Sequence, residues 1–171
     1  MLKKWIPSEP VIHIDDSDVV KPDGYKFESL GIVRDGSEST SSKNVYKKGY
    51  HVTEACVLTG NNHPVSIFSR IHSSAEKDYK SANTITFDAI EQGTTLFRKA
   101  TFAMDRGYDD NKMFLKLDEL GQEYVIRLTA KESFFITTSG LLPLNFATAE
   151  KVKSKPVYST KEKTMKLIFP T

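Results

Sequence analysis

The pattern of hydrophobic and polar positions begins with a short apolar run that stops abruptly. Val11-Ile12-His13-Ile14 is followed directly by Asp15-Asp16-Ser17-Asp18. Because the run is apolar on both faces, it predicts a central strand that ends in a polar loop. Two later stretches, 21–24 and 34–48, are rich in Gly, Pro, Ser or charged residues and predict further loops.

A β-hairpin is predicted after these loops. Two strand-like runs, 50–59 and 65–71, lie on either side of Gly60-Asn61-Asn62-His63-Pro64. Gly and Asn tolerate the positive φ that tight hairpin turns require.

A polar connector at 73–81 leads into a predicted helix at 83–97. Its apolar residues near one face are Ile85, Ala89, Leu96 and Phe97. Gly93 lies inside this helix and should weaken it, because glycine is a poor helix former.

The clearest pattern is a strand–helix–strand unit. The run 99–104 predicts a strand that stops at Asp105, and 124–129 predicts the next strand. Between them, Asp109 or Asp110 can cap a helix that Gly121 closes. The apolar residues at helical spacing are Met113, Phe114, Leu117 and Leu120. A unit of about 30 residues implies two parallel strands joined by a right-handed crossover.

Together these elements predict an α/β fold with one mixed sheet. The Val11 strand should be central, with the antiparallel hairpin on one side and the Lys99 strand, with its crossover helix, on the other. We therefore expect a core at 1–130, followed by a short β-rich segment at 131–171. Strand-like runs in that segment occur at 134–136, 157–158 and 167–169.

Composition is typical of one globular domain: 171 residues, 39% hydrophobic and 27% charged. The net charge of +2, from 24 basic and 22 acidic residues, neither demands nor excludes a nucleic-acid partner. Cys56 is the single cysteine, which excludes an internal disulfide and a cysteine zinc cage. The sequence has no apolar run of the ~20 residues that span a membrane and no signal-peptide pattern at 1–7, so we expect a cytoplasmic protein.

Two predicted strands end in an aspartate, Asp16 or its neighbour Asp15 on the first and Asp105 on the second. In α/β sheets ligands bind at the carboxyl edge of the strands. Carboxylates on adjacent strands repel each other unless a divalent cation lies between them, and such oxygen ligands suit Mg²⁺ or Mn²⁺. The alternative is that these aspartates are ordinary helix caps and turn formers.

Several segments resemble one family, in order along the chain. They include 14–22 (Ile-Asp-Asp-Ser-Asp-Val-Val-Lys-Pro) and 102–109 (Phe-Ala-Met-Asp-Arg-Gly-Tyr-Asp). The remaining segments are 30–37, 48–52 and 124–127. The set resembles bacterial insertion-sequence transposases of the DDE type, which have a ribonuclease H-like catalytic domain. The resemblance runs from about Val11 to Thr129.

The resemblance implies particular site residues. The first catalytic and metal-binding aspartate of the family falls on Asp16, with Asp15 as second choice because alternation leaves open which of the two faces the site. The second falls on Asp105, and Arg106 beside it is a candidate DNA phosphate ligand or, equally, a surface ion-pair partner of Asp109. The implied cofactor is Mg²⁺ or Mn²⁺, and the implied partners are transposon ends and target DNA.

The chain departs from the family at the third acid. These transposases carry it as a glutamate on a late helix with a Tyr, Arg, Glu and Lys signature, after an inserted β-rich segment. The segment from residue 131 resembles the beginning of that insertion, but Glu132, Glu150 and Glu162 lack the signature. We therefore expect a truncated or split transposase that is inactive by itself.

Two other functions stay open. The chain could be a non-catalytic remnant of the same fold that binds DNA, forms a homodimer or regulates an intact transposase. It could also be an unrelated α/β nuclease.

The histidines and the basic tail favour plainer interpretations. His13, His51, His63 and His72 have no zinc-ligand spacing. The lysines between 151 and 166 could contact a DNA backbone through their charge. We favour the alternative that they lie on an exposed sheet edge, where lysine prevents aggregation.

Overall fold

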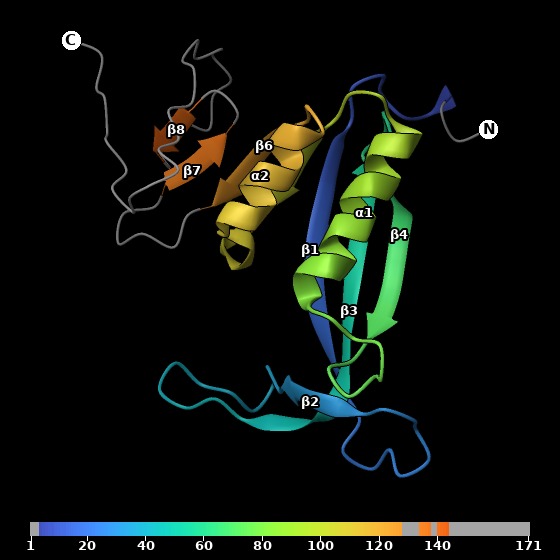
Figure 1. Cartoon of the computed structure of the whole chain (residues 1–171), viewed down its shortest axis with the longest axis vertical. Helices are drawn as coiled ribbons and strands as arrows, with labels where there is room; N and C mark the ends of the chain where they lie inside the picture. The colour runs from blue at the N-terminus through green and yellow to red at the C-terminus, as the bar shows by residue number, and fades with distance from the viewer. Residues whose placement is uncertain (1–3, 128–133, 138–139, 144–171) are drawn as a thin grey trace.

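The structure is a computed structural model that describes residues 4–127, 134–137 and 140–143. In these residues the chain forms one mixed sheet of eight strands, with two α-helices and a short 3₁₀ helix (Figure 1). The strands are β1 (Val11–Val20), β2 (Gly31–Arg34), β3 (Tyr46–Leu58), β4 (Pro64–His72), β5 (Thr101–Met104), β6 (Glu123–Arg127), β7 (Phe134–Thr137) and β8 (Gly140–Pro143). The helices are α1 (Ala82–Leu96), η2 (Arg106–Tyr108) and α2 (Asn111–Glu119).

The central position predicted for the first strand is confirmed. β1 pairs antiparallel with β3 on one side and parallel with β5 on the other. β3 and β4 form the predicted hairpin, and β5 and β6 are the predicted parallel pair around α2. β7 and β8 extend the sheet beyond β6, and β2 pairs with the first residues of β3.

The prediction that the first strand ends at Asp15 is wrong, because β1 continues to Val20. Its partner β3 is 13 residues long and stays paired with it from Ile12 to Val20. The backbone ladder therefore continues through the acidic residues, and two of them have polar cross-strand neighbours. Asp16 lies opposite Thr53, and Asp18 lies opposite His51.

The prediction that this strand is buried on both faces is also wrong. Ile12 and Ile14 are buried, whereas Val11 is 44% exposed and His13 is exposed. Both described helices pack against the face that carries Ile12 and Ile14, as the shared core cluster shows. An apolar run of four residues cannot reveal this, because it fits a strand with either one or both faces covered.

Helix α1 lies across β1, β3 and β4 (Figure 1). The Ser81 side chain caps it by accepting a hydrogen bond from the Thr84 amide. Gly93, expected to weaken the helix, has a packing role instead. A Cβ at this position would lie 2.8 Å from Ile12 Cδ1 and 3.2 Å from the Phe102 ring, so a larger residue would require these side chains to shift.

The second helix, α2, lies between β5 and β6 and completes the predicted strand–helix–strand unit. Asp110, one of the two predicted caps, accepts a hydrogen bond from the Lys112 amide at 3.0 Å and begins α2. Gly121 has a φ of +62° just beyond the helix, as a glycine that closes a helix requires. The Phe114 ring stacks on Tyr124 of β6, with 6.0 Å between ring centroids.

The stretch 34–48, predicted to be a loop, is only partly one. β2 and the first residues of β3 form a short antiparallel ladder that projects away from the two helices (Figure 1). Asp35 at the end of β2 is buried at 5% exposure. It accepts hydrogen bonds from Ser37 and forms a 2.9 Å ion pair with Lys47 Nζ. These contacts order a segment whose composition is that of a loop.

The Asp35 carboxyl makes the stability of this projection depend on pH. The hydrogen bond from Ser37 and the contact with Lys47 lower its pKa from 3.8 to about 2. A lowered folded-state pKa stabilises the fold above the unfolded value, and that stabilisation is lost as the pH falls toward 2. The melting temperature of Asp35→Asn should therefore be lower than that of the wild type at pH 7. Melting curves should show this difference shrinking between about pH 4 and pH 2, and a constant difference would contradict the assignment.

Several sequence predictions fall outside the described residues. They concern the strands at 157–158 and 167–169, the lysines from 151 to 166, and Glu132, Glu150 and Glu162. The strand expected at 134–136 corresponds to β7. Among the described residues, the longest helices are too short and too polar to cross a lipid bilayer.

Candidate metal-binding site

The two predicted aspartates lie on adjacent parallel strands. The pairing of β1 with β5 ends at Ile14 opposite Met104. Asp105 is the next residue on one strand, and Asp16 is two residues further on the other. Because neighbouring strands lie roughly 5 Å apart, both residues lie at the same edge of the β1–β5 pair. The two strands are adjacent and parallel as expected, although β1 continues past Asp16 instead of ending there. That the two carboxylates lie close enough to share a cation stays a prediction.

Strand alternation distinguishes Asp16 from Asp15. Asp16 has the same parity as Ile12 and Ile14, so it lies on the face covered by the helices, and Asp15 lies on the opposite face. The sequence alone could not distinguish Asp16 from Asp15, because the distinction depends on which face of the strand the helices cover.

Asp16 is held by a buried threonine. Thr53 lies directly across from it on β3 and is fully buried. The Thr53 hydroxyl donates to Asp16 Oδ1 at 2.5 Å, and it also lies 2.9 Å from Nε2 of His72, which is buried at the end of β4. One carboxylate oxygen of Asp16 is therefore engaged within the sheet.

Asp105 ends β5 and begins the 3₁₀ helix η2. Its Oδ1 accepts a hydrogen bond from the Gly107 amide at 2.6 Å, and its side chain is exposed. The plain interpretation of Asp105 as a turn former is thus correct for this oxygen. The same bond fixes the orientation of the carboxylate and is compatible with a ligand on Oδ2.

The hydroxyl of Tyr108 lies among the aspartates. Tyr108 is 6% exposed and, among the described residues, its hydroxyl has no partner that meets hydrogen-bond geometry. Burial raises the pKa of this hydroxyl strongly, and the negative charges of Asp16, Asp15 and Asp105 raise it further. The Tyr108 hydroxyl also lies close enough to Asp16 for a hydrogen-bond contribution to its raised pKa. A buried O–H donor beside these carboxylates fits a site that takes up a further polar group, such as water on a bound ion.

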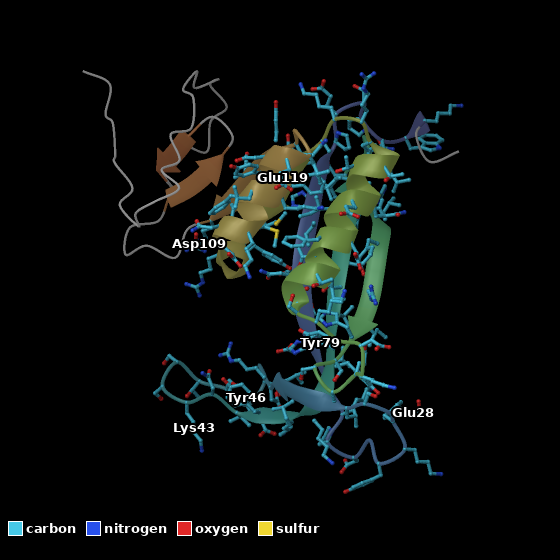
Figure 2. All side chains as sticks on the ribbon, in the orientation of Figure 1. Glu28, Lys43, Tyr46, Tyr79, Asp109 and Glu119 are labelled. Carbon is cyan, nitrogen blue, oxygen red and sulfur yellow. The ribbon has the colours of Figure 1, made fainter. Side chains whose placement is uncertain are left out.

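A second polar contact lies two residues further along β1, on the same face as Asp16. His51 Nδ1 is 2.7 Å from Asp18 Oδ1, and the His51 ring stacks on His72 with 5.6 Å between centroids. The His72 ring also stacks on Tyr79, with 6.0 Å between ring centroids. Tyr79 lies in the connector just before the N-terminus of α1 (Figure 2).

Arg106 is the first residue of η2 and is exposed, directly beside Asp105. Its place on this edge is compatible with the predicted contact to a DNA phosphate, which stays a prediction. A cavity of about 520 Å³ lies elsewhere, at the far end of β1 and β3. Its lining is formed by Val19, Lys21, Phe27, Glu28, Ser29, Tyr50, Ile71 and Glu76.

The sequence interpretation missed Thr53, His72 and Tyr108. Alternation in β3 could have indicated Thr53, since it has the parity of Ala55 and Val57. His72 and Tyr108 carry no local signal, because their places depend on strand register and on the turn after β5. In the part of the chain that the structure describes, three or more Asp, Glu, His or Cys side chains do not group as a ready metal cage.

Comparison with protein-family models and with curated proteins gave no match.

Proposed function

We propose that this chain carries the catalytic core of a DDE-type transposase with a ribonuclease H-like fold, which binds Mg²⁺ or Mn²⁺ and acts on DNA ends. The observation that carries the proposal is the placement of Asp16 and Asp105 at one edge of the adjacent parallel strands β1 and β5. Without that adjacency the two carboxylates could not serve one ion.

The strand order supports the fold part of the proposal. A ribonuclease H-like sheet needs a central strand with an antiparallel hairpin on one side and parallel strands on the other. Here the order β4-β3-β1-β5-β6 has these directions, and α2 connects the parallel pair.

The remaining carboxylate oxygens suit the proposed ion. Thr53 donates to Asp16 Oδ1 and the Gly107 amide donates to Asp105 Oδ1, so the proposed ion would be held by the second oxygen, Oδ2, of each aspartate. Two monodentate carboxylates and several waters form a coordination set that Mg²⁺ accepts. A bound ion supplies the activation of a water nucleophile and the stabilisation of the leaving oxygen. In this scheme Arg106 binds a phosphate of the DNA backbone through its guanidinium.

Mn²⁺ binding tests the proposal. We expect the purified chain to bind Mn²⁺ weakly, with free Mn²⁺ followed by electron paramagnetic resonance during a titration. Asp16→Asn and Asp105→Asn should each lower the affinity by about 10-fold or more, because each removes one of two anionic ligands.

Asp118→Asn is the matched control, since Asp118 is an exposed aspartate on α2. It should leave the Mn²⁺ affinity unchanged. Binding that is insensitive to Asp105→Asn would reduce Asp105 to a turn residue and would remove the metal site.

A further inference from the structure

A chain of hydrogen bonds connects Asp16 to the interior of the sheet. It runs from Asp16 Oδ1 to the Thr53 hydroxyl at 2.5 Å and on to His72 Nε2 at 2.9 Å. Thr53 is 0% exposed and His72 is 1% exposed. The chain therefore joins an exposed carboxylate to two of the most deeply buried polar side chains that the structure describes.

Donor and acceptor roles along this chain follow from the number of protons. A threonine hydroxyl has one proton, and an ionised carboxylate can only accept, so that proton is donated to Asp16. The Thr53 oxygen must then accept from His72, which requires the proton on Nε2. Burial lowers the pKa of His72 and keeps the ring neutral. Nδ1 therefore carries a lone pair, and it is buried without a hydrogen-bond partner among the described residues.

We propose that Thr53 and His72 are positioning residues for the candidate metal site, an inference that rests on the proposed function. Neutral His72 directs the hydroxyl proton of Thr53 toward Asp16, and Thr53 holds the Asp16 carboxylate with Oδ1 turned to β3. The Asp16 carboxylate is thereby held in one orientation toward the ion. Partners of metal-binding carboxylates commonly set metal affinity in this way.

The surroundings of His72 support a positioning role over simple packing. The His72 ring stacks on both His51 and Tyr79, which restricts its rotation, and its Nε2 faces Thr53. A buried acceptor without a partner is costly, so an apolar side chain would suit a purely packing role better. In this arrangement His72 retains its hydrogen bond to Thr53, the residue that contacts Asp16.

The first arm of the test uses the metal-free protein. Long-range ¹H–¹⁵N spectra of the full chain should show His72 protonated at Nε2 and bare at Nδ1. The opposite tautomer would overturn the proposal, because Nε2 would then accept the Thr53 proton and take it away from Asp16.

The second arm measures Mn²⁺ affinity in matched variants. Thr53→Val keeps the shape of the side chain but removes the hydroxyl, and it should weaken Mn²⁺ binding by about 10-fold. Thr53→Ser retains the hydroxyl and should bind within about 2-fold of the wild type. Thr86→Val is the control, because Thr86 is equally buried but donates to the Ala82 carbonyl on α1.

Coupling between the two residues separates positioning from general damage. His72→Leu should weaken Mn²⁺ binding in the wild-type background. It should cause no further loss in the Thr53→Val background, since Thr53→Val already removes the hydrogen bonds that connect His72 to Asp16. If the two substitutions weaken Mn²⁺ binding additively, His72 does not act through Thr53 and the proposal is overturned. Equal Mn²⁺ affinity of Thr53→Val and the wild type would overturn the positioning role while leaving the proposed function intact. A wild type that binds no Mn²⁺ would instead contradict the proposed function itself, and the positioning role with it.

Discussion

The purified chain should nick supercoiled plasmid DNA no faster than background in the presence of Mg²⁺ or Mn²⁺. Two aspartates can hold an ion, but an in-line attack on a phosphodiester also requires the geometry that further ligands impose. Groups that act as a unit in catalysis do not contribute additively, and the loss of one member costs on the order of 10⁴-fold or more. In the proposed DDE site, two acids of three should therefore give no proportionate share of the activity.

A plasmid assay with Asp105→Asn as the companion variant checks this expectation. Wild type and variant should give the same background level of nicked circles over a range of Mn²⁺ concentrations. Clear metal-dependent nicking that Asp105→Asn abolishes would contradict the expectation. It would show that an acid outside the described residues, such as Glu132, Glu150 or Glu162, completes the site.

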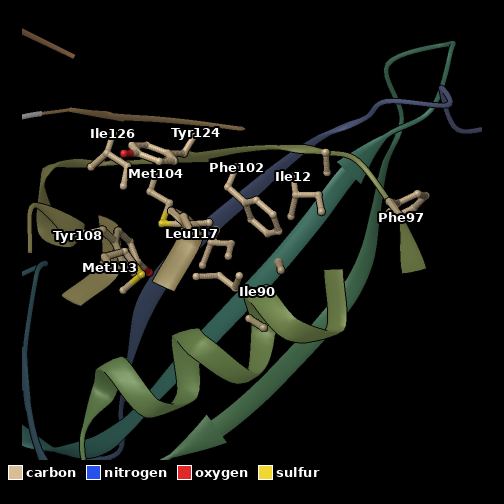
Figure 3. Close-up of a cluster of buried hydrophobic side chains, with 14 of the residues drawn as sticks. Ile12, Ile90, Phe97, Phe102, Met104, Tyr108, Met113, Leu117, Tyr124 and Ile126 are labelled. Atoms are coloured by element: carbon tan, nitrogen blue, oxygen red, sulfur yellow. The ribbon is translucent and has the colours of Figure 1, made fainter. Parts of the chain in front are cut away.

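The largest effect on stability is expected for Phe102→Ala. Phe102 lies on β5, is 0% exposed and packs beside Ile12 in the core cluster (Figure 3). Removing a fully buried ring forfeits its transfer free energy and leaves a cavity, which together cost about 3–5 kcal/mol. Because Phe102 is close to Gly93 of α1, the contact between the sheet and this helix should weaken as well.

Urea unfolding gives the free energy of unfolding of Phe102→Ala and of its control, Phe27→Ala. Phe27 is 56% exposed and contacts Tyr50 edge to face at 6.4 Å between centroids, so its removal should cost about 1 kcal/mol or less. Similar losses for the two variants would show that Phe102 is not the centre of the core.

Periodicity in the sequence predicted the helices and most strands because these signals are local. Ser81 precedes a helical run, Asp110 precedes another, and each does cap a helix. The hairpin turn was predictable for the same reason, with Asn62 at a φ of 60°. The parallel β5–β6 pair followed from the spacing of its two strands around α2.

Tertiary structure decided where β1 ends. The polar residues after Ile14 have low strand propensity, and only pairing with the long strand β3 keeps them extended. The same pairing brings Thr53 beside Asp16, from 37 residues away in the chain. The packing role of Gly93 could not be predicted from the sequence either, because its close neighbours Ile12 and Phe102 belong to other elements.

By itself, the sequence determined a mixed α/β arrangement and two aspartates that follow apolar strand runs. The tertiary structure decided that Asp16 rather than Asp15 lies on the helix-covered face. It also decided that Thr53 and Tyr108 lie beside Asp16 and that His72 contacts Thr53. The physical reason is that caps and turns depend on neighbours in sequence, whereas the environment of a carboxylate depends on strand register and on the face that the helices cover.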